Sequence, residues 1–297
     1  HIYETTMIWG DIPFTEAWVE GVKYPKFDSQ EVVLNGVVSL LDEALNEINL
    51  DDPLAITDYD IFYKGDMQKW IRLAKSLKFR TLMTMVDKDP TKAEQIGKLI
   101  SDGGMISSAD DNLQFPYLQT AGNENPKYKI LEKYTNGINI MFFANNNVLK
   151  PMQERNDSRI SRYFEPGADG VYRGLDTRQA AEETDDQTAC DYYEADPVKT
   201  TEFIDALDDL NTLEPDRALY EIHIQQWIDL MDRPLEEFVQ WRRSGSNGNE
   251  VPVLTVPTEA TSRELIRRWE YSPEEMTANP NAPKESPKIW EKMWFDL

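Results

Sequence analysis

The sequence contains few side chains of the kinds that form compact catalytic or metal centres. Histidine occurs only at His1 and His223 and cysteine only at Cys190, without HExxH or CxxC spacing. Zinc sites and histidine-based catalysis need such ligands close together. No Walker loop or GxGxxG motif follows a predicted strand, which argues against nucleotide cofactors. His223, within EIHIQQW, is therefore predicted to be a packed helix residue.

Carboxylates are abundant, with 54 Asp and Glu in the chain. Glycoside hydrolysis needs only two carboxylates, but in so acidic a chain pairs occur at almost any spacing by chance. Calcium could find oxygen ligands in two acidic groups: Asp58 with Asp60, and the set Asp185, Asp186, Asp191, Glu194 and Asp196. Neither group follows the EF-hand loop, which has a glycine at its sixth position. We interpret both as solvated acidic loops, with a structural calcium as the alternative, and expect no cofactor.

Aromatic side chains in irregular segments are the candidates for ligand binding. They are Tyr117, Tyr172, Tyr192 and Tyr193, together with Arg173 beside one of them. Aromatic rings flanked by amides and charges suit sugar rings, which stack their C–H faces and form hydrogen bonds at their edges. The alternative is that each tyrosine ring only holds its loop against the core.

The composition limits the possible partners of these residues. The 297 residues carry a formal net charge of −23, which argues against nucleic acid because phosphate binding needs a basic surface. Anionic membrane surfaces are disfavoured for the same reason. A single cysteine permits no intramolecular disulfide, and no apolar run reaches the 18 residues of a membrane-spanning helix. Because the chain opens on His1 and not on Met, we expect that a targeting segment has been cut away.

Hydrophobic periodicity predicts that mostly helices position these residues. The predicted helices cover about residues 29–48, 66–86, 90–102, 136–154 and 215–231, and another begins near 234. Asp28 and Asp89 are predicted to cap the first and third of them. The segment VPVLTVP (251–257) is predicted to be an edge strand or hairpin. Residues 105–135 and 165–200 are predicted to be irregular, and no linker divides the chain into domains.

One predicted helix carries an unusual cluster of basic residues. The segment KGDMQKWIRLAKSLKFR (64–80) has six basic residues and one acid, Asp66. On a helical wheel Met67, Trp70 and Leu77 fall on one side, and Ile71 lies among the bases on the other. The segment is therefore predicted to be a helix packed on two sides, whose basic residues pair with the protein's own carboxylates.

Six segments, in this order, resemble the SusD/RagB family of outer-membrane lipoproteins. They are WGDIPFTEAW (9–18), YPKFDSQEVVLNGVVSLLDEALNEI (24–48), DIFYKGDMQKWIRLAKSLKFRTLM (60–83), MQERNDSRISRYF (152–164), IQQWIDLMDRPLEEFVQWRRSG (224–245) and RRWEYSPEEMTANPNAP (267–283). The fourth resembles the family's NDPRxxxYF segment, with Ser158 where proline is usual. These motifs are interpreted as structural signatures that do not contact ligand.

The resemblance implies a mostly α-helical fold of tetratricopeptide-like helix pairs, with long loop-rich insertions and minor β structure. It implies that residues 1–297 form a single SusD-like domain, the larger C-terminal part of a longer chain. The expected function is to capture oligosaccharides at the extracellular face of the outer membrane and deliver them to a TonB-dependent transporter of the SusC type. The membrane would be reached only through a lipid anchor that is absent from this chain.

The resemblance implies binding without catalysis, and three alternatives remain. The first is a peptide-binding member of the RagB type. The second is a glycoside hydrolase that uses two carboxylates, and the third is a helical adaptor that binds only protein.

Overall fold

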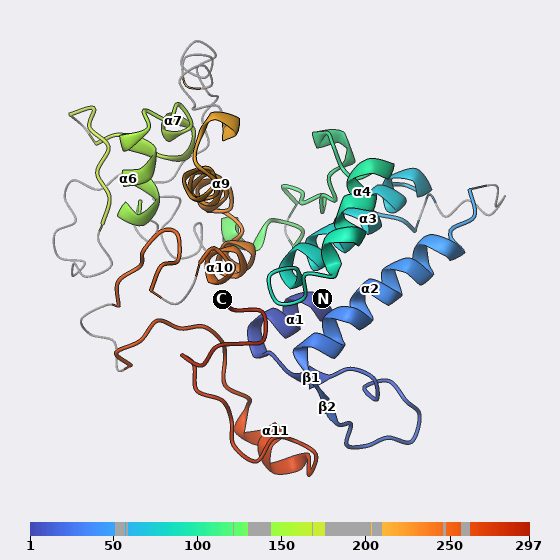
Figure 1. Ribbon diagram of the computed structural model, residues 1–297. Helices are drawn as coiled ribbons and strands as arrows, with labels where there is room; N and C mark the ends of the chain where they lie inside the picture. Colours follow the sequence, from blue (N-terminus) through green and yellow to red (C-terminus); the bar gives the residue numbers. More distant parts are fainter. Residues whose placement is uncertain are drawn as a thin grey trace. The chain divides into compact units, whose positions relative to one another are not determined.

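The computed structural model describes residues 1–50, 57, 59–120, 122–129, 144–167, 169–175, 203, 210–245, 248–256 and 262–297. This part of the chain is mostly helical, as the sequence predicts, and also contains one two-stranded sheet (Figure 1). It folds as two compact units, of which unit 1 comprises residues 1–117 and 266–297 and unit 2 comprises residues 118–265. None of the described helices combines the length and apolar character needed to cross a membrane.

Unit 1 is built on helices that pack one after another. Its elements are α1 (Ile2–Trp9), β1 (Ile12–Pro13), β2 (Phe27–Asp28), α2 (Gln30–Glu47), α3 (Met67–Met85), α4 (Lys92–Asp102), the 3-10 turn η1 (Ala109–Asp111) and α11 (Pro273–Ala278). Helix α2 packs against α1 and α3, and α3 packs against α4. Strands β1 and β2 pair antiparallel. The three longest helices of unit 1 lie where the sequence predicts them.

The core of unit 1 joins both ends of the chain. Met7, Leu34, Leu82 and Phe295 are fully buried in it. Gln30 is buried with them and is satisfied by both termini, because its Nε2 donates to the Thr6 carbonyl at 2.7 Å and its Oε1 accepts from the Phe295 amide at 3.4 Å. Since buried amides need such partners, Gln30 fixes the C-terminal segment against α1 and α2.

Gly10 shows how closely the final segment approaches α1. Its φ of 80° lies in the left-handed region that favours glycine. A Cβ at this position would lie 2.9 Å from Nη2 of Arg268. That same Nη2 donates to the carbonyl of Trp9. Glycine is therefore required both by the backbone conformation and by the guanidinium that packs on it.

Unit 2 is a second helical cluster. Its described elements are α6 (Asn146–Glu154), α7 (Ile160–Tyr163), the 3-10 turn η3 (Leu210–Thr212), α9 (Pro215–Asp229) and α10 (Pro234–Arg243). The core consists of Ala144, Val148, Leu149, Met152, Phe164, Ile224 and Ile228. Trp227 ties α9 to α6 by donating from Nε1 to the Asn147 carbonyl at 3.0 Å. The predicted packing of His223 is confirmed, since its side chain is buried. Its Nδ1 forms a hydrogen bond of 3.0 Å with Nε2 of Gln240.

Three predictions of detail were wrong. Ser29, and not Asp28, caps α2, and Thr91 stands at the cap position of α4 in place of Asp89. Both aspartates are engaged elsewhere: Asp28 accepts from the amide and hydroxyl of Thr15, and Asp89 from the hydroxyl of Thr91. Residues 251–256 form no strand, because Trp241 and Ser244 of the α10 segment hold the backbone there.

The basic residues of α3 are used within the protein, as predicted. Arg72 pairs with Asp111 at 2.9 Å, and Lys78 pairs with Asp42 at 2.5 Å. Lys69 and Lys75 reach backbone carbonyls instead, at Asp110 and Gly103. This helix therefore presents no free anion-binding face formed by those four side chains.

Candidate functional site

A cluster of exposed, neighbouring aromatic rings in the described part of unit 1 contains one predicted residue, Tyr117. The rings of Phe62, Phe115 and Tyr117 follow one another with centroids 6.2 and 4.9 Å apart. Their exposed fractions are 36%, 52% and 47%. We call these three residues the aromatic row. Because the ring of Tyr117 contacts another exposed ring, it belongs to a surface cluster and does not hold its loop against the core.

The half-buried ring of Trp70 and the buried ring of Tyr63 support the aromatic row. The ring of Phe62 meets that of Trp70 edge to face at 6.2 Å, and Trp70 meets Tyr63 edge to face at 5.2 Å. Tyr63 is buried and donates from its hydroxyl to the Asp111 carbonyl at 2.8 Å. Edge-to-face pairs of this kind stabilise beyond their buried area. The aromatic row therefore packs against residues at the start of α3 that are held in place by the η1 turn.

Asp60 organises the turn that leads into α3. Its buried carboxylate accepts from the amides of Phe62, Tyr63 and Gly65 at 3.0, 3.1 and 2.9 Å. It also accepts from Nε1 of Trp70 at 2.9 Å. Burial opposes ionisation, but these donors outweigh it and lower the pKa of Asp60 to about 2. The carboxylate is therefore ionised at neutral pH and fully occupied by hydrogen bonds.

Asp58 and Asp60 form one of the two acidic groups for which the sequence leaves a calcium site as the alternative. Asp58 lies outside the described residues, as do the five acidic residues of the second group. The hydrogen bonds to Asp60 employ the oxygen lone pairs that a cation would need. Within the described ranges, no group of three or more His, Cys, Asp or Glu is placed to hold a metal ion.

Unit 2 contains a separate cavity of about 1100 Å³, large enough for a drug-sized ligand. Helix α9 forms one wall, and the end of α6 with the turn that follows it forms another. Polar and apolar residues both line it: Glu154, Arg155, Asn156, Arg159, Phe203, Leu210, Arg217, Tyr220, Glu221, Ile222, Gln225, Gln226, Asp229, Leu230 and Arg233. We call this space the arginine cavity.

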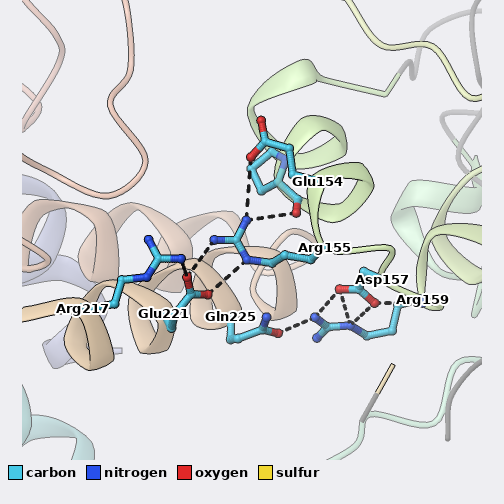
Figure 2. A network of polar contacts seen from close by, with 8 residues as sticks. Glu154, Arg155, Asp157, Arg159, Arg217, Glu221 and Gln225 are labelled. Atoms are coloured by element: carbon cyan, nitrogen blue, oxygen red, sulfur yellow. Dashed lines mark hydrogen bonds and ion pairs between the residues drawn. The ribbon is translucent and has the colours of Figure 1, made fainter. Parts of the chain in front are cut away.

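An internal network of polar contacts holds the walls of the arginine cavity (Figure 2). Arg159 forms a forked pair with the fully buried carboxylate of Asp157, with Nη2 to Oδ2 at 2.5 Å, and reaches Oε1 of Gln225 at 2.6 Å. Arg155 donates from Nε and Nη2 to both oxygens of Glu221, at 3.1 and 3.2 Å. These contacts join the α6–α7 turn to α9 at two successive points of the helix.

The charges of the cavity largely cancel. Arg217 shares the carboxylate of Glu221 with Arg155, and Arg233 pairs with Asp229 at 2.6 Å. Such an arrangement suits an uncharged polar ligand better than a strongly charged one. Glu221 and Asp229 accept hydrogen bonds from arginines, which differs from the protonated carboxylic acid that glycoside hydrolysis requires. Nε2 of Gln225 is buried and has no partner among the described residues, so it leaves one donor for a bound acceptor or a water.

The other predicted site residues do not line this cavity. Tyr172 is partly buried against the core of unit 2, and burial raises the pKa of its hydroxyl. Arg173 forms an ion pair with Asp169 four residues earlier. Tyr192 and Tyr193 lie outside the described residues. A role in binding stays a prediction for all of them and for Tyr117.

The sequence reasoning missed most of the residues that form these two features. Phe115 lies only two residues from Tyr117 in the sequence, but Phe62 joins them only because the fold brings together positions more than fifty residues apart. The face of α9 on the cavity was visible in the sequence, since Arg217, Glu221, Gln225 and Asp229 follow at four-residue intervals and must share one side of a helix.

Comparison with known families supports the resemblance carried by the motifs. A family model named SusD-like and described as "starch-binding associating with outer membrane" matches residues 1–204. The chain belongs to the SusD-like family. The match covers unit 1 up to Tyr117 and the α6–α7 part of unit 2, so it includes the aromatic row and one wall of the arginine cavity.

Solved structures share the SusD-like fold at low sequence identity. A chitin-binding protein superimposes with a TM-score of 0.80 at 19% identity, over 99% of this chain and 78% of its own. A SusD homolog from Bacteroides uniformis gives 0.78 at 18% identity, over 100% and 79%. A chitin-binding SusD homolog from Flavobacterium johnsoniae gives 0.75 at 16%, over 100% and 78%. No curated protein matches the chain.

Proposed function

We propose that this SusD-like protein binds oligosaccharides and acts in nutrient uptake at the bacterial outer membrane. The observation that carries the proposal is the aromatic row, in which three exposed rings lie at intervals close to the length of one sugar residue. The rings are inclined to one another by 65° and 54°, so the C–H faces of a bound glycan can pack against their exposed faces and edges. Gln114 and Asn112, exposed on the same segment, provide amides for the hydroxyl groups.

Two further points support binding without catalysis. The family is described as starch-binding, and two similar structures are described as chitin-binding. In the arginine cavity, the three lining carboxylates, Glu154, Glu221 and Asp229, form ion pairs with arginines. The proposed ligand is therefore a neutral glycan that the protein binds without cleaving.

The proposal includes the partner and the location that the family resemblance implies. The protein would lie at the extracellular face of the outer membrane, held by a lipid anchor. It would deliver its ligand to a TonB-dependent transporter of the SusC type. Purification from outer membranes followed by mass spectrometry tests this part, because the transporter should co-purify and the intact mass should include a lipid.

Glycan binding itself is tested by affinity electrophoresis in native gels that contain soluble starch or glycol chitin. We expect retardation of the wild-type chain, a loss of at least tenfold in affinity for the double variant Phe115→Ala/Tyr117→Ala, and no release of reducing ends. Tyr128→Ala is the matched control, since Tyr128 is 52% exposed, lies in unit 2 and makes no ring contact among the described residues.

The outcomes separate the alternatives. Released reducing ends would identify a hydrolase, and retention of peptides in place of any glycan would identify a peptide-binding member. Co-purification of a transporter without affinity for glycan or peptide would indicate an adaptor. Equal retardation of the double variant and the wild type would contradict the role of the aromatic row.

A further inference from the structure

A second cavity of the protein lies in unit 1, and none of its lining residues belongs to the aromatic row. Its volume is about 520 Å³. The end of α1, strands β1 and β2, the loop before β2 and helix α11 form its walls. The lining residues that carry the argument are Trp9, Lys23, Tyr24, Phe27, Tyr271 and Glu275. We call this space the tryptophan cavity.

The walls of the tryptophan cavity are mainly aromatic and proline carbons. Phe27 and Tyr271 meet edge to face at 5.1 Å. Tyr271 is buried and fixed in place, because its hydroxyl donates to the carbonyl of Asp11 at 2.7 Å and its amide donates to Oγ of Ser286 at 2.8 Å. The aromatic walls are therefore formed before any ligand arrives, which lowers the entropy cost of binding.

Polar groups without protein partners lie at the edge of these walls. The indole N–H of Trp9 and the hydroxyl of Tyr24 form no hydrogen bond with any described residue. The ammonium of Lys23 lies 5.2 Å from the centre of the Tyr24 ring. Glu275 binds Asn279 through Oε1 at 2.9 Å, and no described residue donates to its Oε2. The cavity thus offers donors from Trp9, Tyr24 and Lys23 and an acceptor from Glu275.

We propose that the tryptophan cavity is a second sugar-binding site, which takes a neutral mono- or disaccharide unit. A sugar ring matches both properties of the cavity, because its C–H faces stack on aromatic carbons and its hydroxyls both donate and accept. The volume fits one or two such rings. A proline-rich peptide could use the same aromatic walls, but its backbone carbonyls need only donors and leave the Glu275 carboxylate without a partner.

This site goes beyond the proposed function, because a chain with both sites would hold two glycan segments at once. The indole N–H of Trp9 provides a direct probe of the second site. Its resonance in a ¹H–¹⁵N spectrum of the full chain can be assigned by its disappearance in Trp9→Phe. The probes are neutral di- and trisaccharides of glucose, N-acetylglucosamine, xylose, mannose and galactose, together with a decaproline peptide.

We expect at least one saccharide to shift the Trp9 resonance saturably, and Tyr24→Ala to weaken that effect at least tenfold. Trp18→Ala is the matched control, since Trp18 is almost fully exposed on the same loop but does not line the cavity. Tyr117→Ala should leave the Trp9 shift intact, which separates this site from the aromatic row.

Three results would overturn the inference. If glycan retards the chain in gels but no saccharide moves the Trp9 resonance, the second site fails while the proposed function stands. A shift caused only by decaproline would replace the sugar with a peptide ligand. A saccharide shift of undiminished affinity in Tyr24→Ala would place the binding outside this cavity.

Discussion

Replacing Asp60 by alanine tests how the aromatic row is held in place. The change removes a carboxylate that accepts three backbone amides and the indole N–H of Trp70, all between 2.9 and 3.1 Å. Each hydrogen bond to a charged group contributes roughly 1.5–3 kcal/mol, but water can replace part of the lost bonding at the loop amides. We therefore expect Asp60→Ala to lower the free energy of unfolding by about 3 kcal/mol.

The conformation of the turn adds to this expectation. Lys64 has a φ of 55° and Gly65 a φ of 85°, so two successive residues occupy the left-handed region. For a residue other than glycine this conformation costs roughly 1–2 kcal/mol, and the hydrogen bonds to Asp60 are what compensate for it. Without the carboxylate, the turn is expected to relax and carry Phe62 away from Phe115. The variant should therefore lose glycan affinity as well as stability.

Urea unfolding, followed by circular dichroism and tryptophan fluorescence, measures the loss. Asp110→Ala is the matched control, because the exposed Asp110 side chain forms no hydrogen bond or ion pair with a described residue. A loss below about 0.5 kcal/mol for Asp60→Ala, the range of ordinary surface substitutions, would refute the reasoning.

The pH dependence gives a second test at the same residue. Folding lowers the pKa of Asp60 from its ordinary value of 3.8 to about 2. A lowered folded-state pKa means that the ionised carboxylate stabilises the fold at all pH values above about 4 and that this contribution is lost as the pH falls toward 2. The stability difference between wild type and Asp60→Asn should therefore be constant from pH 7 to 5 and shrink below pH 4. A difference that does not change down to pH 3 would contradict this account.

Three further predictions concern other parts of the two units. Trp70→Ala should destabilise by about 3 kcal/mol through lost packing, whereas Lys69→Ala should leave glycan affinity unchanged; lower affinity at an unchanged melting temperature in the latter would contradict us. Asp157→Ala leaves the Arg159 guanidinium without its buried partner and should lower the free energy of unfolding in urea by about 3 kcal/mol. Asp229→Ala, which removes the exposed partner of Arg233, should lower it by less than about 1 kcal/mol. Burial raises the pKa of Glu237 from 4.5 to about 7, so the folded protein loses stability as the pH rises from 4.5 to 7. Glu237→Gln should therefore increase the free energy of unfolding by on the order of 2 kcal/mol at pH 8 and by little at pH 5. An equal increase at both pH values would refute the assignment.

The helices could be predicted from the sequence because their signals are local. Helix α3 begins after Asp66, whose side chain accepts from the Lys69 amide as an N-cap should. The choice between neighbouring cap residues was not local. Asp28 and Ser29 both suit the cap of α2, and the carboxylate was taken by Thr15, which lies thirteen residues away and meets it only in the folded chain.

The candidate site was less accessible for the same reason. Tyr117 could be selected because it is an aromatic residue in an aperiodic segment, but the same rule selected Tyr172, whose ring packs against the core of unit 2. Exposure separates the two residues, and exposure depends on which side chains the fold places around each loop. The row required Phe62 and Phe115 to meet, which depends on how η1 packs against α3.

The contacts of the third and fourth family motifs explain why their buried polar groups do not take part in ligand recognition. Asp60 and Trp70 of the third motif satisfy each other, and Arg159 of the fourth motif is bound to Asp157 and to Gln225 of the fifth. Groups that are occupied in this way cannot also bind a ligand without a loss of stability. Phe115 and Tyr117 lie outside the motif segments, and their rings are exposed. The segment 113–117 can therefore change its side chains, and with them the preferred glycan, while the motif contacts that fix its position stay intact.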